Sequence, residues 1–121
     1  MIKIKNLTFK YPDGTEALRS LDINVNEGES IALMGANGAG KSSLLLAITG
    51  IAPYTEGEIY VDDILLSKKT VADVRQRVGI IFQDPDDQLF MPSVFDDVAF
   101  GPRNKGLNEK ETVRVAESAL E

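Results

Sequence analysis

The stretch that decides the fold is Gly35-Ala36-Asn37-Gly38-Ala39-Gly40-Lys41-Ser42, which fits the spacing GxxxxGK[ST] without a mismatch. It follows residues 31–34, a short apolar run of the kind that forms buried strands in parallel sheets. It precedes residues 43–49, which predict a helix that ends at Gly50. The order of strand, glycine-rich loop and helix predicts an α/β fold.

The spacing of this glycine-rich loop, residues 35–42, suits a polyanion. Its glycines let the backbone curl so that successive N–H groups face one point. The helix behind it adds unpaired N–H groups and the positive end of its dipole. Lys41 would reach the β- and γ-phosphates, and Ser42 would offer a hydroxyl to Mg²⁺. We therefore expect a nucleoside triphosphate site. A dinucleotide loop would need the order GxGxxG, and a plain glycine-rich turn with an incidental lysine is the structural alternative.

Composition excludes several other functions. The chain has 121 residues, a formal net charge of −6, and neither Cys nor His. Disulfides, the usual Zn²⁺ sites and Ser-His or Cys-His catalysis are therefore excluded. A chain this acidic would not bind nucleic acid by general phosphate neutralisation, so we expect no nucleic-acid partner.

Outward from the loop, alternating residues predict paired strands. Residues 2–11 predict a half-buried strand with a bulge near Asn6, which pairs with residues 21–25. A hairpin is expected about Asp62-Asp63, followed by a short helix over residues 71–77. Residues 78–82 predict a second buried strand.

The last third predicts two helices. Ser93 with Asp96 resembles a capping box, and Gly101-Pro102 is expected to end that helix. Asn108 with Glu111 predicts the start of the second. Its expected apolar face consists of Val113, Ala116 and Leu120.

Four segments in this order resemble the nucleotide-binding subunit of ABC transporters: Tyr11-Pro12-Asp13-Gly14, the loop, Gly57-Glu58-Ile59-Tyr60-Val61-Asp62 and Ile81-Phe82-Gln83. The stretches PDDQLF (85–90) and DVAFGP (97–102) are similar to its energy-coupling factor group, importers of cobalt, nickel and vitamins. The resemblance runs over essentially all 121 residues. It implies a P-loop ATPase core with an antiparallel β-subdomain (1–29 and 57–66), the P-loop core itself (30–56 and 78–83), and the Q-loop with the start of a helical subdomain (84–121).

The resemblance also implies roles for single residues. Tyr11 would stack on adenine, or else it ends a strand. Gln83 would reach Mg²⁺ and the attacking water, or else it is a polar strand end. The implied nucleotide contacts are Tyr11, Gly35, Ala36, Asn37, Gly38, Ala39, Gly40, Lys41, Ser42 and Ser43, with Lys41 and Gln83 catalytic and Ser42 and Gln83 on Mg²⁺. Leu89-Phe90-Met91 would lie near the groove for a membrane subunit, or else it packs in a core.

Some expected features depart from the family pattern or are missing. Asp84 stands where Asn is more frequent, and Ala36 and Ser43 stand where Pro and Thr are frequent; none of these removes a phosphate ligand. The signature LSGGQ, an acidic strand ending in Asp-Glu and the switch histidine do not occur. We therefore expect the front half of such a subunit from a truncated reading frame, with inefficient hydrolysis and with the apolar edges of residues 31–34 unpaired.

The implied partners are a transmembrane coupling subunit, a substrate-capture membrane subunit and a second ATPase subunit, identical or not. The implied location is peripheral, on the cytoplasmic face of the cell membrane. Two alternatives remain: a non-catalytic nucleotide-binding or interaction fragment, and a small P-loop kinase or GTPase. The GTPase is disfavoured because Asn104-Lys105-Gly106-Leu107 lacks the Asp of a guanine-reading NKxD.

Overall fold

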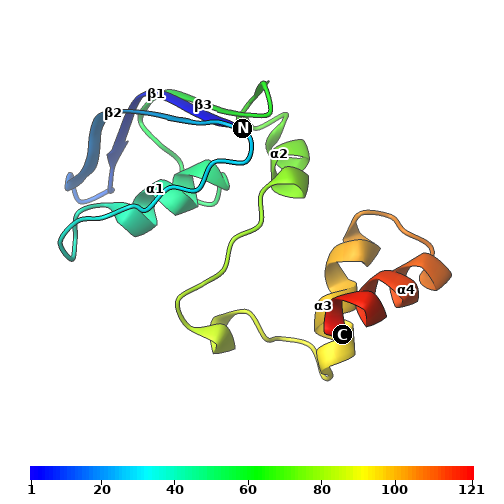
Figure 1. The fold of residues 1–121 in the computed structure, drawn as a ribbon. Helices are drawn as coiled ribbons and strands as arrows, with labels where there is room; N and C mark the ends of the chain where they lie inside the picture. Colours follow the sequence, from blue (N-terminus) through cyan, green and yellow to red (C-terminus); the bar gives the residue numbers. More distant parts are fainter. The chain divides into compact units, whose positions relative to one another are not determined.

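The computed structural model describes all residues, Met1–Glu121, as two compact units, Met1–Ile80 and Ile81–Glu121. The first unit holds an antiparallel sheet of four strands in the order β2-β1-β3-β4 together with two helices (Figure 1). Its elements are β1 (Ile2–Lys10), β2 (Glu16–Val25), α1 (Lys41–Ile48), β3 (Glu56–Val61), β4 (Ile64–Leu65) and α2 (Val71–Arg77). The second unit holds the 3₁₀ helix η1 (Pro85–Asp87), α3 (Val94–Asn104) and α4 (Glu109–Leu120). None of these helices is long and apolar enough to span a membrane.

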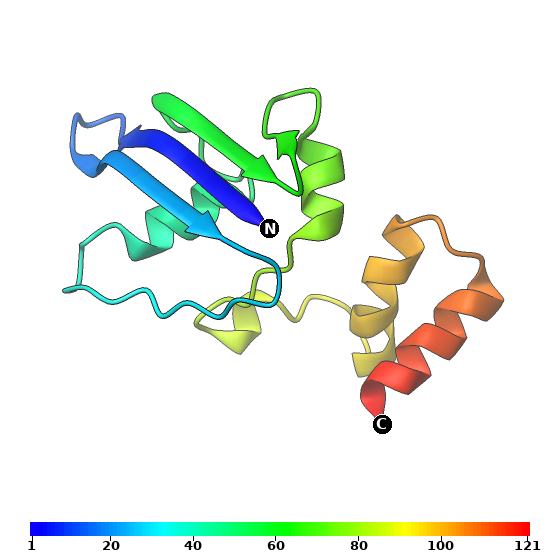
Figure 2. The ribbon, with the colours of Figure 1, turned by 45° about the horizontal axis from the view of Figure 1, so that its top comes forward.

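Strand β1 is central because it pairs with both β2 and β3. The predicted bulge is confirmed: the register shifts between Ile4 and Leu7, and Asn6 has φ 49°. The bulge keeps Ile4, Leu7 and Phe9 on the buried side, each at most 4% exposed, although simple alternation would turn one of them outward. Helix α1 lies against this face of the sheet (Figure 2), where its residue Leu44 joins the same core.

The β3–β4 hairpin forms as predicted. Asp62 and Asp63 link the two strands with φ values of 46° and 64°. Positive φ at both central residues is the geometry of the two-residue turns that match the twist of paired strands. Helix α2 follows with the predicted bounds and buries Val74 in the core.

Two segments expected to be buried strands are not strands in this chain. Residues 31–34 and 78–82 belong to no strand, and Met34 and Ile81 are 88% and 89% exposed. The prediction of burial was wrong here because a parallel strand is buried only between neighbouring strands, and all four strands of this chain belong to the antiparallel sheet. The expectation that residues 31–34 expose unpaired apolar edges agrees with the structure.

In the second unit, both predicted helix starts form. Ser93 accepts a hydrogen bond from the N–H of Asp96, and Asn108 accepts one from Glu111. The expected end at Gly101-Pro102 was wrong, since α3 continues to Asn104. Gly101 lacks the Cβ that normally clashes with the ring of a following proline, so α3 can continue through Pro102. It ends instead where Gly106 takes φ 81°.

The predicted apolar face of α4 is only partly buried. Ala116 is fully buried and Val113 is half-buried, whereas Leu120 is 48% exposed. Thr112, whose hydroxyl donates to the carbonyl of Leu107, fills the remaining buried position.

Candidate functional site

The glycine-rich loop is curled rather than extended. Gly38 and Gly40 have φ values of 82° and 87°, a left-handed conformation that suits glycine. Between them, the N–H of Ala39 donates to the carbonyl oxygen of Ala36 at 3.1 Å. The chain therefore turns tightly into the start of α1, as the spacing of the glycines predicts.

The backbone amides of this turn are not used by the rest of the molecule. Helix α1 begins without a side-chain cap, because its N-cap residue is Gly40. Within residues 38–43, five N–H groups donate to no acceptor in the structure, those of Gly38, Gly40, Lys41, Ser42 and Ser43. Unpaired donors at a helix N-terminus, together with the helix dipole, favour an anion. The arrangement can hold the oxygens of a phosphate chain.

Lys41 adds a formal positive charge to this site. Its Nζ donates to the carbonyl oxygens of Gly35 and Ala36 at 2.6 Å and 2.7 Å. The ammonium is thus folded over the first residues of the loop instead of pointing into solvent. Carbonyl oxygens are weaker acceptors than phosphate oxygens, so an incoming phosphate can replace them without leaving the ammonium unpaired.

Strand β2 supports the loop from behind. A Cβ built on Gly40 would lie 2.3 Å from the carbonyl oxygen of Ala17 and 2.9 Å from Cδ2 of Leu18. Only a residue without a side chain can approach the strand this closely. The β2 backbone therefore determines where α1 begins and where its amides point.

Tyr11 lies directly after β1 and reaches the same helix end. Its hydroxyl is 2.7 Å from Oγ of Ser43, in the first turn of α1. Its ring packs edge-to-face on Phe9, with ring centroids 4.9 Å apart. Tyr11 remains 42% exposed, so part of the ring is open to a ligand. The structure therefore brings Tyr11 to the loop, and the Tyr11–Ser43 contact is one that the sequence patterns did not reveal.

Gln83 belongs to the second unit, in the exposed segment before η1. Its proposed role on Mg²⁺ stays a prediction.

The cluster Leu89-Phe90-Met91 lies further along the same unit. Leu89 and Phe90 are 61% and 64% exposed, so the interpretation of this cluster as core packing is wrong for both. The Asp97 carboxylate accepts hydrogen bonds from the backbone N–H groups of Phe90 and Met91 and holds the segment against α3.

No group of three or more carboxylate, His or Cys side chains that could hold a metal ion occurs in the structure. The exposed Ser42 hydroxyl, which has no hydrogen-bond partner, is the side-chain oxygen next to the open amides. A Mg²⁺ ion here would therefore take most of its ligands from phosphate oxygens and water, which is its usual habit beside nucleotides.

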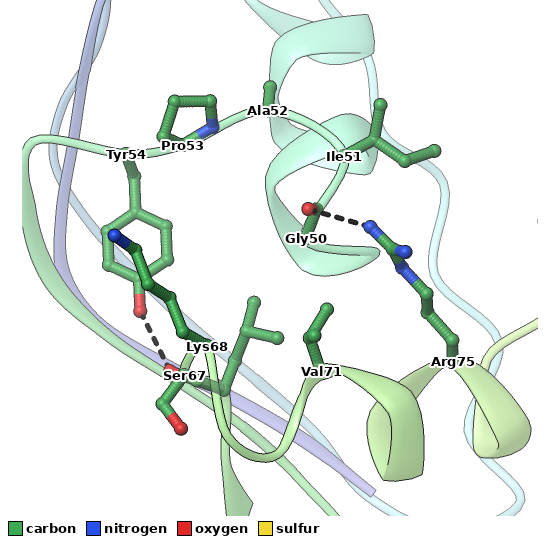
Figure 3. Close-up of a pocket in the computed structure, with 10 residues that line it drawn as sticks. Gly50, Ile51, Ala52, Pro53, Tyr54, Ser67, Lys68, Val71 and Arg75 are labelled. Atoms are coloured by element: carbon green, nitrogen blue, oxygen red, sulfur yellow. Dashed lines mark hydrogen bonds between the residues drawn. The ribbon is translucent and has the colours of Figure 1, made fainter.

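A hollow of about 340 Å³ lies at the opposite end of α1 (Figure 3). Its wall is mainly apolar and includes Ile51, Pro53, Leu66 and Val71. On its rim, the Arg75 guanidinium donates to the carbonyl oxygens of Thr49 and Gly50, at 3.1 Å and 3.0 Å, and so covers the C-terminal end of α1.

Comparison with known proteins finds relatives that share most of this sequence. A family model described as ABC transporter matches residues 18–121. A putative ABC transporter ATP-binding protein of Geobacter sulfurreducens is 51% identical over 100% of this chain and 49% of its own length. An energy-coupling factor transporter ATP-binding protein of Methanosphaera stadtmanae is 51% identical over 100% of this chain and 44% of its own. The chain thus spans about half the length of these curated relatives.

Solved structures show the same fold. The cbiO1 protein of Clostridium perfringens, described as part of the ABC transporter complex cbiONQ, superposes with a TM-score of 0.78 at 41% identity, over 93% of this chain and 46% of that one. A dimeric ATP-binding cassette in a post-hydrolysis state with ADP and phosphate superposes with a TM-score of 0.85 at 29% identity, over 99% and 56%.

Proposed function

This chain belongs to the ABC transporter family of ATP-binding domains, and from that premise we propose that it binds Mg·ATP at residues 35–42 as the energy-coupling subunit of an importer. The observation that carries the proposal is the set of unpaired amides at the start of α1, beside the Lys41 ammonium. Five free donors and one cation match the many oxygens of a triphosphate.

Each residue of the site then has a chemical task. The five unpaired amides at the start of α1 bind the phosphate oxygens. Lys41 moves from the carbonyl oxygens of Gly35 and Ala36 to the β- and γ-phosphates. Asn37 and Ala39 complete the curve of the loop. A Mg²⁺ ion bound with the nucleotide would neutralise phosphate charge, and the Ser42 hydroxyl would be its ligand from this loop.

Tyr11 is proposed to bind the base. Its ring stands at the end of α1 that carries the open amides and is partly exposed. Stacking of a base on an aromatic ring contributes roughly 1–3 kcal/mol and is tolerant of which base is bound. Tyr11 therefore adds affinity for a nucleotide over a free triphosphate.

We further propose that the subunit works with a transmembrane coupling subunit, a substrate-capture membrane subunit and a second ATPase copy or paralogue, at the cytoplasmic face of the membrane. The names of the relatives support this, since they include an energy-coupling factor transporter protein and part of a cbiONQ complex. The exposed Leu89 and Phe90 side chains offer apolar surface for a membrane-subunit contact.

The phosphate site is tested by replacing its cation. Lys41→Ala should weaken binding of a fluorescent ATP analogue by about tenfold or more, because a charge-assisted contact is worth roughly 1.5–3 kcal/mol. Lys68→Ala, at an exposed lysine on the hollow beyond the other end of α1, is the matched control and should bind normally. Equal affinity of both variants would overturn the proposed site, and preference for GTP over ATP in competition would favour a GTPase.

A separate measurement addresses hydrolysis. Because the signature and acidic-strand motifs do not occur in these 121 residues, the chain alone should turn over ATP far more slowly than about 1 s⁻¹. Phosphate release measured with and without Lys41→Ala checks this, and turnover at or above that rate that depends on Lys41 would contradict it.

A further inference from the structure

The Tyr11–Ser43 contact joins two residues that are far apart in sequence. Ser43 is only 4% exposed, and its hydroxyl has the hydroxyl of Tyr11 as its hydrogen-bond partner at 2.7 Å. A buried hydroxyl without a partner would be costly, so the two side chains hold each other in place. No other hydrogen bond restrains the Tyr11 ring.

The backbone of Tyr11 is restrained as well. Its N–H donates to the carbonyl oxygen of Thr15 at 2.8 Å, and its carbonyl accepts from the N–H of Gly14 at 2.9 Å. Hydrogen bonds therefore hold the Tyr11 backbone in the turn after β1 and the Tyr11 hydroxyl at the first turn of α1. The ring also packs edge-to-face with Phe9, and it remains 42% exposed.

We infer that Ser43 is a positioning residue for Tyr11: its hydroxyl fixes the aromatic ring next to the phosphate-binding amides before any nucleotide arrives. The inference rests on the proposed ATP site and adds that its base end is preorganised. A ring that is already immobile loses less rotamer entropy when a base stacks on it, and this gain applies only to ligands that carry a base.

The first experiment needs no ligand. In the protein labelled with ¹³C at tyrosine rings, Ser43→Ala should shift and narrow the Tyr11 ring resonances toward those of a freely rotating side chain. Ser43→Thr, which keeps the hydroxyl, should leave them near their original positions. Tyr11 resonances that do not respond to Ser43→Ala in a folded protein would overturn the inference.

The second experiment separates the contribution of the base to binding from that of the phosphates. Tyr11→Phe keeps the ring but removes the hydrogen bond, so affinity for ATP should fall about two- to tenfold, the effect of one ordinary hydrogen bond. Affinity for inorganic triphosphate should stay unchanged. Tyr60→Phe, which removes a hydroxyl bonded to Glu58 at 3.0 Å elsewhere on the sheet, is the control and should alter neither affinity.

A double-variant cycle completes the test. If the two hydroxyls act through one hydrogen bond, Tyr11→Phe with Ser43→Ala should weaken ATP binding no more than the worse single variant. Additive losses, or an equal loss for ATP and triphosphate with Tyr11→Phe, would overturn the positioning role. Failure of the ATP site itself would appear differently, as unchanged binding in Lys41→Ala, and the ligand-free spectra would still decide the inference.

Discussion

Gly38 and Gly40 share a left-handed backbone, yet they have very different surroundings. A Cβ on Gly38 would meet nothing within 4 Å, whereas one on Gly40 would lie 2.3 Å from the carbonyl oxygen of Ala17. The free energy of unfolding should therefore fall by about 1–2 kcal/mol in Gly38→Ala, from backbone conformation alone. It should fall by at least about 3 kcal/mol in Gly40→Ala, because β2 or the loop must also move. Urea denaturation measures both.

Gly38→Ala serves as the control for Gly40→Ala. Both substitutions add the same methyl group at nearly the same φ, so their difference reports the contact with β2. Equal destabilisation would mean that the loop does not rest on Ala17 as described. Nucleotide binding should follow the same order, with Gly40→Ala the more damaging variant.

At the residue scale, the loop was predictable and the Tyr11 contact was not. The motif in residues 35–42 is local, and each of its glycines and the lysine follows from backbone sterics and phosphate chemistry. The partner of Tyr11 lies 32 positions away. No periodicity in one sequence connects a turn after a strand to the first turn of a helix, so only the folded chain reveals that Ser43 is the partner.

At the scale of elements, Arg75 joins α2 to the end of α1. Its guanidinium donates to the carbonyl oxygens of Thr49 and Gly50, which the helix itself leaves unpaired. Arg75→Met should lower the free energy of unfolding by about 1–2 kcal/mol, through two lost hydrogen bonds and a lost cation at the helix C-terminus. Thermal or urea unfolding measures the change.

Arg77 offers the matched control for this prediction. It lies on the same helix and approaches Asp62 at 3.7 Å, with both side chains largely in solvent. Exposed ion pairs of this kind contribute little to stability, so Arg77→Met should be close to neutral. If Arg77→Met were as damaging as Arg75→Met, general loss of charge on α2 would explain the result better than the helix end.

The stability of the α3–α4 pair should decrease at acid pH. The Ser93 hydroxyl, followed by the Arg103 guanidinium, lowers the pKa of Asp96 below 3.8, and Arg103 lowers the pKa of Glu109 below 4.5. Both carboxylates thus have a lower pKa folded than unfolded. Their stabilisation is complete above about pH 4.5 and is lost as the pH falls through 4.5 and 3.8 toward the lower folded values. Helical circular dichroism across this range measures it.

Arg103→Met should flatten this acid dependence, because the guanidinium reaches Asp96 at 3.3 Å and Glu109 at 2.9 Å. Arg114→Met, at an exposed arginine of α4 without an ion-pair partner, should leave it intact. Added salt should weaken the effect, since these side chains are exposed to solvent. An identical pH profile in wild type and Arg103→Met would contradict the assignment.

Local sequence patterns predicted most of the elements, but they failed for the end of α3 and for the two expected buried strands. Helix starts at Ser93 and Asn108 follow from short-range capping, and the hairpin follows from Asp62-Asp63. The end of α3 was missed because Gly101 relieves the clash that Pro102 normally causes, which shifts the stop to Gly106. The strands expected at 31–34 and 78–82 depend on distant pairing partners, which a local pattern does not supply.

At the scale of the whole molecule, the unpaired apolar run at residues 31–34 should make the chain self-associate. Ile31 and Met34 are 55% and 88% exposed beside backbone groups that no strand covers. Sedimentation velocity should show association that rises with protein concentration. Replacing both residues by Ser should reduce it and change the free energy of unfolding by less than about 1 kcal/mol.

A serine substitution at a buried isoleucine, Ile59, is the control for those at the exposed residues Ile31 and Met34. Ile59 is fully buried in the core of the sheet, so Ile59→Ser should cost about 3 kcal/mol or more and increase association through unfolded chain. A monomeric wild-type protein at all concentrations would contradict the role given to residues 31–34.

The free amide of Gly38 also has a chemical consequence for ageing of the protein. Asn37 is exposed, neither its side chain nor the following N–H is held by a hydrogen bond, and the next residue has no side chain to hinder ring closure. Asparagine is among the thermolabile residues. Attack of the Gly38 nitrogen on the Asn37 amide carbon releases ammonia, and water then opens the ring to aspartate or isoaspartate. Deamidation would thus install an anion inside the anion site, and stored samples should lose affinity for triphosphates at the rate at which ammonia is released.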